Sequence, residues 1–343
     1  MNRRSPVREA GTISPTAGRR RTATTLVALL AVLTGAVDVG SAASLVRVSQ
    51  ADPYASCSTE GETGRNYPSA EVEPQAAVNP RDPRNIVAVW QQDRWSNGGS
   101  RGIVAGVSFD GGASFTEVPL PFSRCVEGGA DFPRASDPWV SFGPDGTAYA
   151  VALSVSYDTD TPATAIVAAT STDGGRSWHN LRVIQQDASP HLFNDKETVT
   201  ADALTPGTAY VVWDRLEDPE EPFFTGPALF SKTIDGGRTW SDPKVIVQTG
   251  IAGQTVGSVI VTAKSGGSPL YNFFTLLVDS GPNKGLNVAF VKSTDGGETW
   301  SPPRIVTPLQ SIAFTDHRTR LAGRTGDILI SAAIDPDSGD LYV

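Results

Sequence analysis

Two short stretches of the sequence place an arginine directly after an aspartate, with tryptophan close by. They read VWQQDRW (89–95) and VVWDRL (211–216). A guanidinium at the edge of a cavity can bind a sugar carboxylate through two parallel hydrogen bonds, while an aromatic ring packs against the sugar ring. We therefore predict carbohydrate binding, with Arg94, Trp95 and Arg215 as ligand-binding residues. The alternative is that each Asp-Arg pair forms a rim salt bridge that holds neighbouring structural units together.

The strand geometry predicts which of these side chains lie together. Successive side chains of a β-strand point to opposite faces of its sheet. Trp90, Gln92 and Arg94 should therefore share one face of their strand, and Trp213 and Arg215 should share one face of theirs. Each arginine would then lie beside an indole at the rim of the ligand-binding cavity.

Carboxylates gather in the polar segments that lead into the apolar runs of the chain. Asp137 follows Arg134 in one such segment, and Asp195 and Glu197 lie in another. A carboxyl group within hydrogen-bonding reach of a leaving oxygen can act as general acid or base in glycosidic cleavage. The candidate catalytic residues are Asp93, Asp137, Asp195 and Glu197, and Arg134 joins the predicted ligand-binding residues.

A repeat indicates the elements that must position these residues. A polar turn that ends in an aromatic residue occurs four times, and its shared aspartates are 63, 62 and 60 residues apart. The periods consist of short β-rich runs separated by Gly, Pro and Asp turns, without helical periodicity after the N-terminal segment. Four-stranded units at a near-constant period predict the blades of a β-propeller, each buried against its neighbours. The four copies are VSFDGGASF (107–115), TSTDGGRSW (170–178), KTIDGGRTW (232–240) and KSTDGGETW (292–300).

The repeated turn itself is predicted to be structural. Its aspartate can accept hydrogen bonds from backbone amides across the turn, and its glycines supply positive φ. Its aromatic residue is expected to fill space near the next strand or blade. In a propeller these third turns lie at the opposite end of each blade from the loops that form the mouth. We expect Asp110, Asp173, Asp235 and Asp295 to stabilise the fold and to take no part in catalysis or calcium binding.

The pattern S/T-x-D-x-G-x-T/S-W/F resembles the Asp-box, or BNR repeat, of the sialidases (neuraminidases) and related six-bladed propellers. The resemblance covers roughly residues 70–343 and implies an all-β, six-bladed β-propeller of the sialidase type. Only the start of a fifth unit follows the fourth repeat, so we expect about four and a half blades, incomplete at the C-terminus. The alternative is a five-bladed ring completed by residues 44–70.

The same resemblance implies a sugar-cleaving activity. Sialidases hold the carboxylate of sialic acid with three arginines and use a tyrosine nucleophile supported by a glutamate, with an aspartate as acid/base. This sequence departs from that pattern, since EVEPQAAV (71–78) lacks the family's first arginine and SNGGSRG (96–102) lacks its aspartate. The family's tyrosine would fall beyond Val343. The expected function is a secreted exo-α-sialidase-like glycoside hydrolase acting on glycans, and the alternative is a non-catalytic propeller that binds a glycan or a protein.

The N-terminal residues predict secretion. Three arginines (19–21) precede an apolar run (26–37) that is too short to span a bilayer, and small residues follow it. We expect residues 1–43 to be a signal peptide, residues 44–69 an N-terminal extension and residues 70–343 the propeller. Export by a twin-arginine route is the alternative.

Cysteine content and net charge limit the compartment in which the protein works and the classes of partner that it can bind. Cys57 and Cys125 are the two cysteines of the chain and are expected to form a disulfide in an oxidising compartment. Residues 1–43 carry six of the 28 basic and two of the 37 acidic residues, so the remaining chain has a net charge of −13. This charge argues against nucleic acid or an anionic membrane as partner. The sequence contains no H-E-x-x-H motif and no Cys/His cluster, so we expect no metal or cofactor and a glycan or glycoconjugate as partner.

Overall fold

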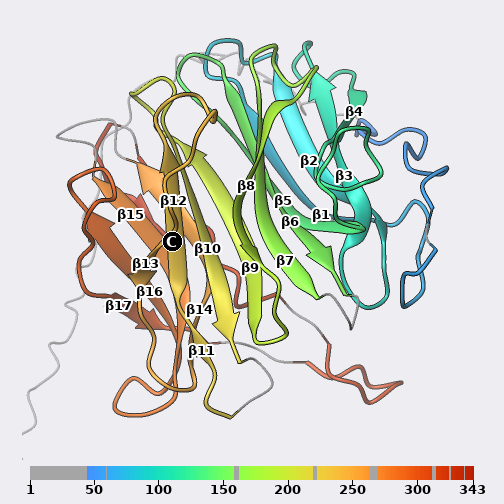
Figure 1. Ribbon diagram of the computed structural model, residues 1–343. Helices are drawn as coiled ribbons and strands as arrows, with labels where there is room; N and C mark the ends of the chain where they lie inside the picture. Colours follow the sequence, from blue (N-terminus) through green and yellow to red (C-terminus); the bar gives the residue numbers. More distant parts are fainter. Residues whose placement is uncertain are drawn as a thin grey trace, which may run out of the picture. The chain divides into compact units, whose positions relative to one another are not determined.

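The computed structural model describes residues 45–343 except 59, 158–161, 219–221, 263–268, 311–313, 324–325 and 336. The predicted signal peptide, residues 1–43, lies outside the described residues. The described chain consists of β-strands joined by turns and irregular segments (Figure 1). No helix in this part of the chain is long and apolar enough to cross a membrane.

The first eight strands form two antiparallel blades of four strands each. Within each blade the strands pair in chain order, because short turns join antiparallel neighbours. The two blades share one sheet through the pairing of Ser100 with Ala135. The first blade comprises β1 (Glu71–Val78), β2 (Ile86–Arg94), β3 (Ser100–Ser108) and β4 (Thr116–Leu120), and the second comprises β5 (Arg134–Phe142), β6 (Ala148–Ser156), β7 (Ala163–Ser171) and β8 (His179–Asp187).

The third and fourth blades repeat this arrangement in a second sheet (Figure 1). The short strand β11 (Thr225–Gly226) pairs antiparallel with β10 (Ala209–Glu217) and parallel with β14 (Gly253–Thr262), and so joins the two blades. A two-stranded pair, β18 (Ala333–Ile334) and β19 (Leu341–Tyr342), follows the fourth blade. The third blade comprises β9 (Leu192–Ala201), β10 (Ala209–Glu217), β12 (Ala228–Thr233) and β13 (Lys244–Val247), and the fourth comprises β14 (Gly253–Thr262), β15 (Leu270–Val278), β16 (Gly285–Ser293) and β17 (Arg304–Pro308).

The hydrophobic core lies between the blades. One cluster joins the first blade to the second and includes Val87 and Val167, and another joins the second to the third and includes Leu153 and Trp213. A third cluster joins the third blade to the fourth. Each inner strand is therefore apolar on both faces, since one face packs on the preceding blade and the other on the following blade. Four complete blades packed in this way confirm the all-β propeller class predicted from the repeat.

Each Asp-box closes on itself through the same four hydrogen bonds. In the second copy, the Ser171 hydroxyl and the Ser177 amide donate to Asp173 Oδ1 at 2.7 and 3.0 Å, and the Ser177 hydroxyl donates to Oδ2 at 2.6 Å. The Gly175 amide donates to the Ser171 hydroxyl at 2.8 Å. The aspartate is thus an acceptor at the centre of its own turn, as its sequence position predicts. The same bonds are centred on Asp110, Asp235 and Asp295.

The Asp-box turn packs against the preceding blade. A Cβ on Gly175 would lie 2.8 Å from Val87, and a Cβ on Gly297 would lie 2.5 Å from the ring of Phe230. Both glycines have positive φ, at 98° and 85°, so glycine is required for the backbone and for the close approach. The Trp300 ring packs edge-on against Phe230 with 5.4 Å between centroids. The aromatic residue of the Asp-box was expected to lie near the next strand or blade. In the structure it fills the interface with the preceding blade.

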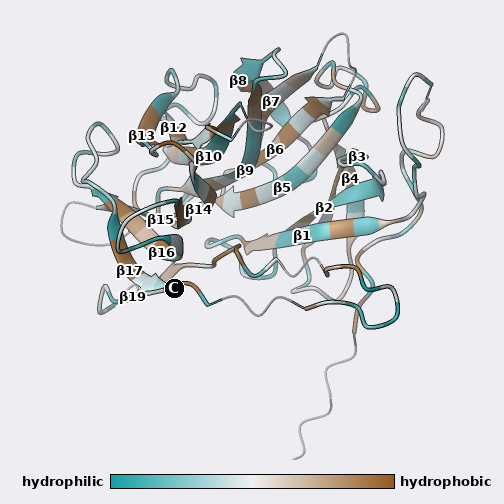
Figure 2. Ribbon diagram, turned by 90° about the horizontal axis from the view of Figure 1, so that it is seen from below, coloured by the Kyte–Doolittle hydropathy of each residue, from teal (hydrophilic) through white to brown (hydrophobic). Residues whose placement is uncertain are grey.

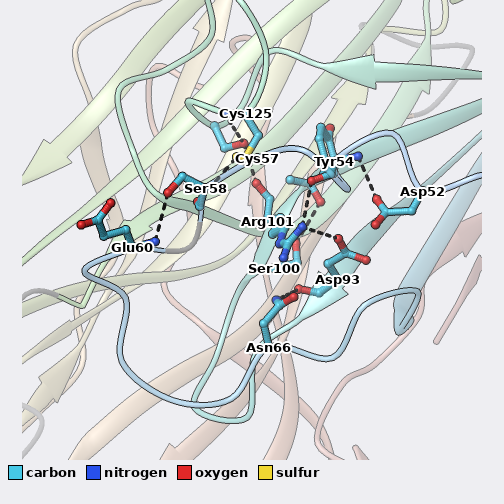
Figure 3. Close-up of a disulfide and its surroundings, with 12 residues drawn as sticks. Asp52, Tyr54, Cys57, Ser58, Glu60, Asn66, Asp93, Ser100, Arg101 and Cys125 are labelled. Atoms are coloured by element: carbon cyan, nitrogen blue, oxygen red, sulfur yellow. Dashed lines mark hydrogen bonds and ion pairs between the residues drawn. A yellow bond between two sulfur atoms is a disulfide. The ribbon is translucent and has the colours of Figure 1, made fainter.

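The N-terminal extension covers the face of the first blade that points away from the second (Figure 3). A disulfide joins Cys57 to Cys125, in the loop after β4, with 5.4 Å between the Cα atoms. The Tyr54 hydroxyl is buried and donates to the Ile103 carbonyl at 2.6 Å. The Tyr54 ring packs with Trp90 and Val104. The extension thus takes the place that a preceding blade would occupy.

We expect Asp173→Ala to lower the free energy of unfolding by roughly 1–3 kcal/mol, because three donors of the second Asp-box lose their acceptor. The measurement is urea denaturation followed by tryptophan fluorescence. Asp242→Ala is the matched control, because Asp242 is exposed beside the third Asp-box, and it should change stability by less than about 0.5 kcal/mol. An Asp173→Ala variant as stable as the wild type would contradict the structural role of the Asp-box.

Candidate functional site

The innermost strand of each blade carries a β-bulge near its start. Its register with the second strand shifts there in all four blades, and the first residue of each bulge has a left-handed backbone. That conformation costs a non-glycine residue roughly 1–2 kcal/mol and persists where the surrounding structure fixes it. The four bulge residues are Glu73 on β1 (φ 54°), Asp137 on β5 (φ 50°), Lys196 on β9 (φ 55°) and Gly257 on β14 (φ 66°).

These four bulges line a single pocket. The pocket has a volume of about 270 Å³, and Trp139, Leu329 and Ile330 are among the other residues of its wall. Figure 2 shows the innermost strands β1, β5 and β14 arranged about a common centre. Each blade therefore contributes one bulge to the pocket wall, in the same way that each contributes one Asp-box to the opposite end. The bulges lie at the end of the blades opposite the Asp-boxes, where ligand binding was predicted.

Three of the bulge side chains form a charged cluster. The Lys196 ammonium makes a close ion pair with Asp137 Oδ2, and its Nζ atom lies 4.0 Å from Glu73 Oε2. The Ser136 hydroxyl donates to Asp137 Oδ1. The side chains of Lys196, Glu73 and Asp137 are 17%, 35% and 10% exposed. Glu73 is therefore the carboxyl of the cluster most open to a ligand.

An amide connects this cluster to Arg94. Gln91 Nε2 donates to Glu73 Oε2 at 2.6 Å and to Asp137 Oδ1 at 3.4 Å. Gln91 Oε1 accepts a hydrogen bond from the Arg94 guanidinium at 2.9 Å. Arg94 therefore lies behind the pocket wall and fixes the orientation of the amide that contacts both carboxyl groups.

The pKa values of the three groups diverge. Burial, and then repulsion from Asp137, raises the pKa of Glu73 to about 7. Burial also acts to raise the pKa of Asp137, but the Lys196 ammonium and the hydrogen bonds to the carboxylate outweigh it, so this pKa lies below its usual value. The pKa of Lys196 is raised, because attraction to Asp137, Asp195 and Glu73 outweighs burial. At neutral pH, Lys196 and Asp137 are charged, and Glu73 is divided between its protonated and ionised forms.

Two further candidate carboxyls flank Lys196. Glu197 lines the pocket, but its carboxyl oxygens are buried and have no hydrogen-bond partner among the described residues. Burial, and then the charge of Asp137, raises the pKa of Glu197 well above its usual value. The same two causes raise the pKa of Asp195 to about 7. Burial therefore favours the protonated form of both Glu197 and Asp195.

Asp93 lies apart from the pocket, beneath the N-terminal extension (Figure 3). Its fully buried carboxylate accepts a hydrogen bond from the Ser69 amide at 2.7 Å and lies 3.6 Å from the Arg101 guanidinium. Arg101 also donates to the Tyr54 carbonyl at 2.8 Å. Burial raises the pKa of Asp93, while the hydrogen bonds from Ser69 and Gln92 act to lower it. Asp93 fastens the extension to the first blade.

The backbone at Asp93 also changes the direction of Arg94. The Trp90 indole donates to Gln92 Oε1 at 2.9 Å, so these two side chains share a face as predicted. Asp93 has a left-handed backbone, with φ at 65°, which interrupts the alternation of the strand. Arg94 consequently contacts Gln91. The prediction that Arg94 shares the face of Trp90 and Gln92 was wrong for this reason.

The tryptophans beside the arginines are part of the core. Trp90, Trp95 and Trp213 are 5%, 4% and 0% exposed, and none of the three lines the pocket. The Trp213 indole donates to Asn194 Oδ1 at 2.9 Å. The aromatic side chain that lines the pocket is Trp139, which lies two residues after Asp137.

Arg134 is fully buried under the N-terminal extension. Its guanidinium donates to Glu62 Oε2 and to the Thr63 carbonyl, each at 2.6 Å. The guanidinium carbon lies 4.4 Å from the ring centre of Trp95 and 5.1 Å from that of Tyr157. Arg134 thus binds the extension rather than facing the pocket, which explains why Trp95 is covered.

Asp214 and Arg215 separate in the structure. Arg215 donates to Glu217 Oε1 at 2.8 Å, on the same strand. Asp214 is buried and accepts hydrogen bonds from the Thr255 hydroxyl at 2.8 Å and the Gly257 amide at 2.7 Å. Asp214 therefore holds the bulge of the fourth blade. The salt bridge between Asp214 and Arg215 that the alternative interpretation required is not among the ion pairs of the described residues. Asp214 instead joins the third blade to the fourth through hydrogen bonds, and Arg215 pairs with Glu217.

The predicted site omitted Glu73 and Lys196, which the structure places with Asp137. A signal for them was present, because Glu73, Asp137 and Lys196 are 64 and 59 residues apart and so follow the period of the Asp-boxes. Among the described residues, no group of three or more His, Cys, Asp or Glu side chains is arranged to hold a metal ion.

Comparison with known proteins agrees with the fold. The BNR/Asp-box repeat family matches residues 291–302, the fourth Asp-box, and confirms the recognition of the repeat. The chain is similar in structure to an α-L-arabinanase from Penicillium chrysogenum solved with arabinobiose, with a TM-score of 0.51 and 14% identity over 68% of this chain and 66% of that one. It is also similar to the NanB sialidase from Streptococcus pneumoniae, with a TM-score of 0.45 and 12% identity over 71% of this chain and 53% of that one. Comparison with curated protein sequences finds no match.

Fold and repeat together define the class: this chain is an Asp-box β-propeller. It spans about two thirds of the length of the arabinanase and about half of the length of NanB. At these identities the similarity extends to the fold, and the chemistry has to be argued from the pocket.

We expect Glu73→Gln to flatten the pH dependence of stability between about pH 4.3, the usual pKa of glutamate, and the folded-state pKa of about 7. In that interval the folded state binds a proton that the unfolded state has lost, so the free energy of unfolding falls as pH rises. Urea denaturation across this interval measures the slope. Glu71→Gln, two residues earlier on β1, is the control and should retain the wild-type slope. A wild-type slope in Glu73→Gln would refute the raised pKa.

Proposed function

We propose that the protein acts on glycans, that it binds a sugar in the bulge-lined pocket, and that it hydrolyses a glycosidic bond there with Glu73 as the proton donor. The observation that carries this proposal is the cluster of Glu73, Asp137 and Lys196 in a pocket beside Trp139. The fold gives additional support, because a propeller of similar structure was solved as an arabinanase with arabinobiose.

The pKa values suit acid catalysis. A general acid works best when its pKa lies near the operating pH, and burial places that of Glu73 at about 7. The neighbouring Asp137 stays ionised, so the two carboxyl groups differ in protonation as an acid and its electrostatic partner do. When Glu73 gives its proton to the leaving oxygen, the Lys196 ammonium, 4.0 Å away, stabilises the carboxylate that forms.

A second candidate function is a non-catalytic glycan-binding propeller, and a specific observation favours it. Glycosidases commonly place a sugar between two carboxyl groups about 5–9.5 Å apart. Glu73 and Asp137 share one amide donor, Gln91 Nε2, at 2.6 and 3.4 Å and lie on the same ammonium, that of Lys196, so a sugar between the two carboxyl groups would have to displace these partners. Glu197, the third carboxyl of the pocket, has buried oxygens without a hydrogen-bond partner among the described residues, and burial raises its pKa well above the usual value.

A more specific form of the proposal is that the glycans cleaved are sialosides, and the Asp-box repeat supports it. It requires arginines that are free to hold the carboxylate of the sugar. Arg94 is bonded to Gln91 and Arg215 to Glu217, so a ligand carboxylate would have to displace these contacts. Secretion remains part of the proposal and is supported by the Cys57–Cys125 disulfide, which suits an oxidising compartment. N-terminal sequencing of secreted protein should find a start near residue 44, and full-length protein retained in the cell would contradict it.

The enzymatic proposal is tested with a panel of fluorogenic glycosides that includes arabinosides and sialosides. Glu73→Gln should lower kcat by about 10²-fold or more while retaining ligand binding, whereas Glu71→Gln should retain activity. Binding on a glycan array without turnover of any glycoside would favour the non-catalytic function. Neither turnover nor binding would refute both functions.

A further inference from the structure

We infer that the pocket selects uncharged sugars and discriminates against sugars that carry a carboxylate, an inference that rests on the proposed sugar site. Among the described residues that line the pocket, Lys196 is the basic residue. Its ammonium is already paired with Asp137 and lies 4.0 Å from Glu73. A ligand carboxylate would therefore meet two protein carboxyl groups wherever it approached the cation.

The nearby arginines do not supply the missing cation. The Arg134 guanidinium is fully buried, and its donors are occupied by Glu62, Asn97 and the carbonyls of Thr63 and Gly98. None of Arg94, Arg134 and Arg215 lines the pocket. Arginine is the side chain best suited to hold the carboxylate of an acidic sugar, because its guanidinium can form two parallel hydrogen bonds to it. The described pocket wall presents no such group.

The same wall suits an uncharged sugar. A sugar hydroxyl is a hydrogen-bond donor, and the carboxyl oxygens of Glu73 and Asp137 are acceptors. Trp139, Val259 and Leu329 give the pocket an apolar side against which the carbon face of a sugar ring can pack. With Lys196 and Asp137 neutralising each other, the cluster carries no net charge when Glu73 is protonated and one negative charge when it is ionised. The net charge of the cluster therefore does not attract an acidic ligand, whether Glu73 is protonated or ionised.

The test uses pairs of 4-methylumbelliferyl glycosides that differ only in a carboxylate. The pairs are glucoside with glucuronide and galactoside with galacturonide, together with a sialoside, and both binding and turnover are measured. We expect the wild type to favour the uncharged member of at least one pair by about tenfold or more, since like charges brought together across an interface are strongly disfavoured. Asp137→Asn, which releases Lys196 from its partner, should reduce or reverse that preference.

Glu73→Gln provides a second variant in case Asp137→Asn does not fold, because it also removes a negative charge and should improve binding of the acidic member. Glu71→Gln is the control and should keep the wild-type preference. A wild type that favours the glucuronide, the galacturonide or the sialoside would overturn the inference while leaving the sugar site intact. No binding of any member would refute the proposed function itself, and the inference with it.

Discussion

In each of the four blades, the innermost strand has one residue with a left-handed backbone at the β-bulge near its start. The pocket depends on these four bulges. Glu73, Asp137 and Lys196 adopt this backbone without being glycines. The conformation is unfavourable for each of them, so the surrounding contacts must hold it. As a result, the bulge side chain of each of the first three blades leaves the alternation of its strand and meets the other two at a common centre.

The contacts that hold the bulges are the contacts that hold neighbouring blades together. Asp214 on β10 accepts the amide hydrogen of Gly257 in the bulge of the next blade. Further along, the hydroxyls of Thr198 and Thr200 on β9 donate to the carbonyls of Ser258 and Ile260 on β14, at 2.8 and 2.7 Å. Side chains thus bridge adjacent innermost strands that do not pair as a ladder. The Asp-boxes join the same blades at their other end, so the position of each bulge is set from both ends of its blade.

The blades could be predicted from the sequence because their turn chemistry is local. An aspartate, two glycines and an aromatic residue define each Asp-box within nine residues, and the spacing of the copies gives the repeat. The pocket could be predicted only in part. Asp137 and Glu197 were assigned catalytic roles, whereas Glu73 and Lys196 were given none, because a left-handed backbone at a glutamate or a lysine leaves no mark in residue type.

The arginines show a second limit of reasoning from the sequence. Arg94 was placed by strict alternation, which the left-handed backbone of Asp93 interrupts. Arg134 was placed at the mouth by its position at the start of β5, but the N-terminal extension binds it through Glu62. That contact joins residues 72 positions apart, and nothing in the local sequence of either residue indicates it.

The central claim is that the bulges bring Glu73, Asp137 and Lys196 together as one electrostatic unit. A ¹³C NMR titration of the Glu73 carboxyl in the wild type and in Lys196→Met tests it most directly. We predict a pKa of about 7 in the wild type and a higher pKa in Lys196→Met, because the ammonium stabilises the ionised form of Glu73. A wild-type pKa near the usual value of about 4.3, or a pKa that does not change when Lys196 is removed, would contradict the account.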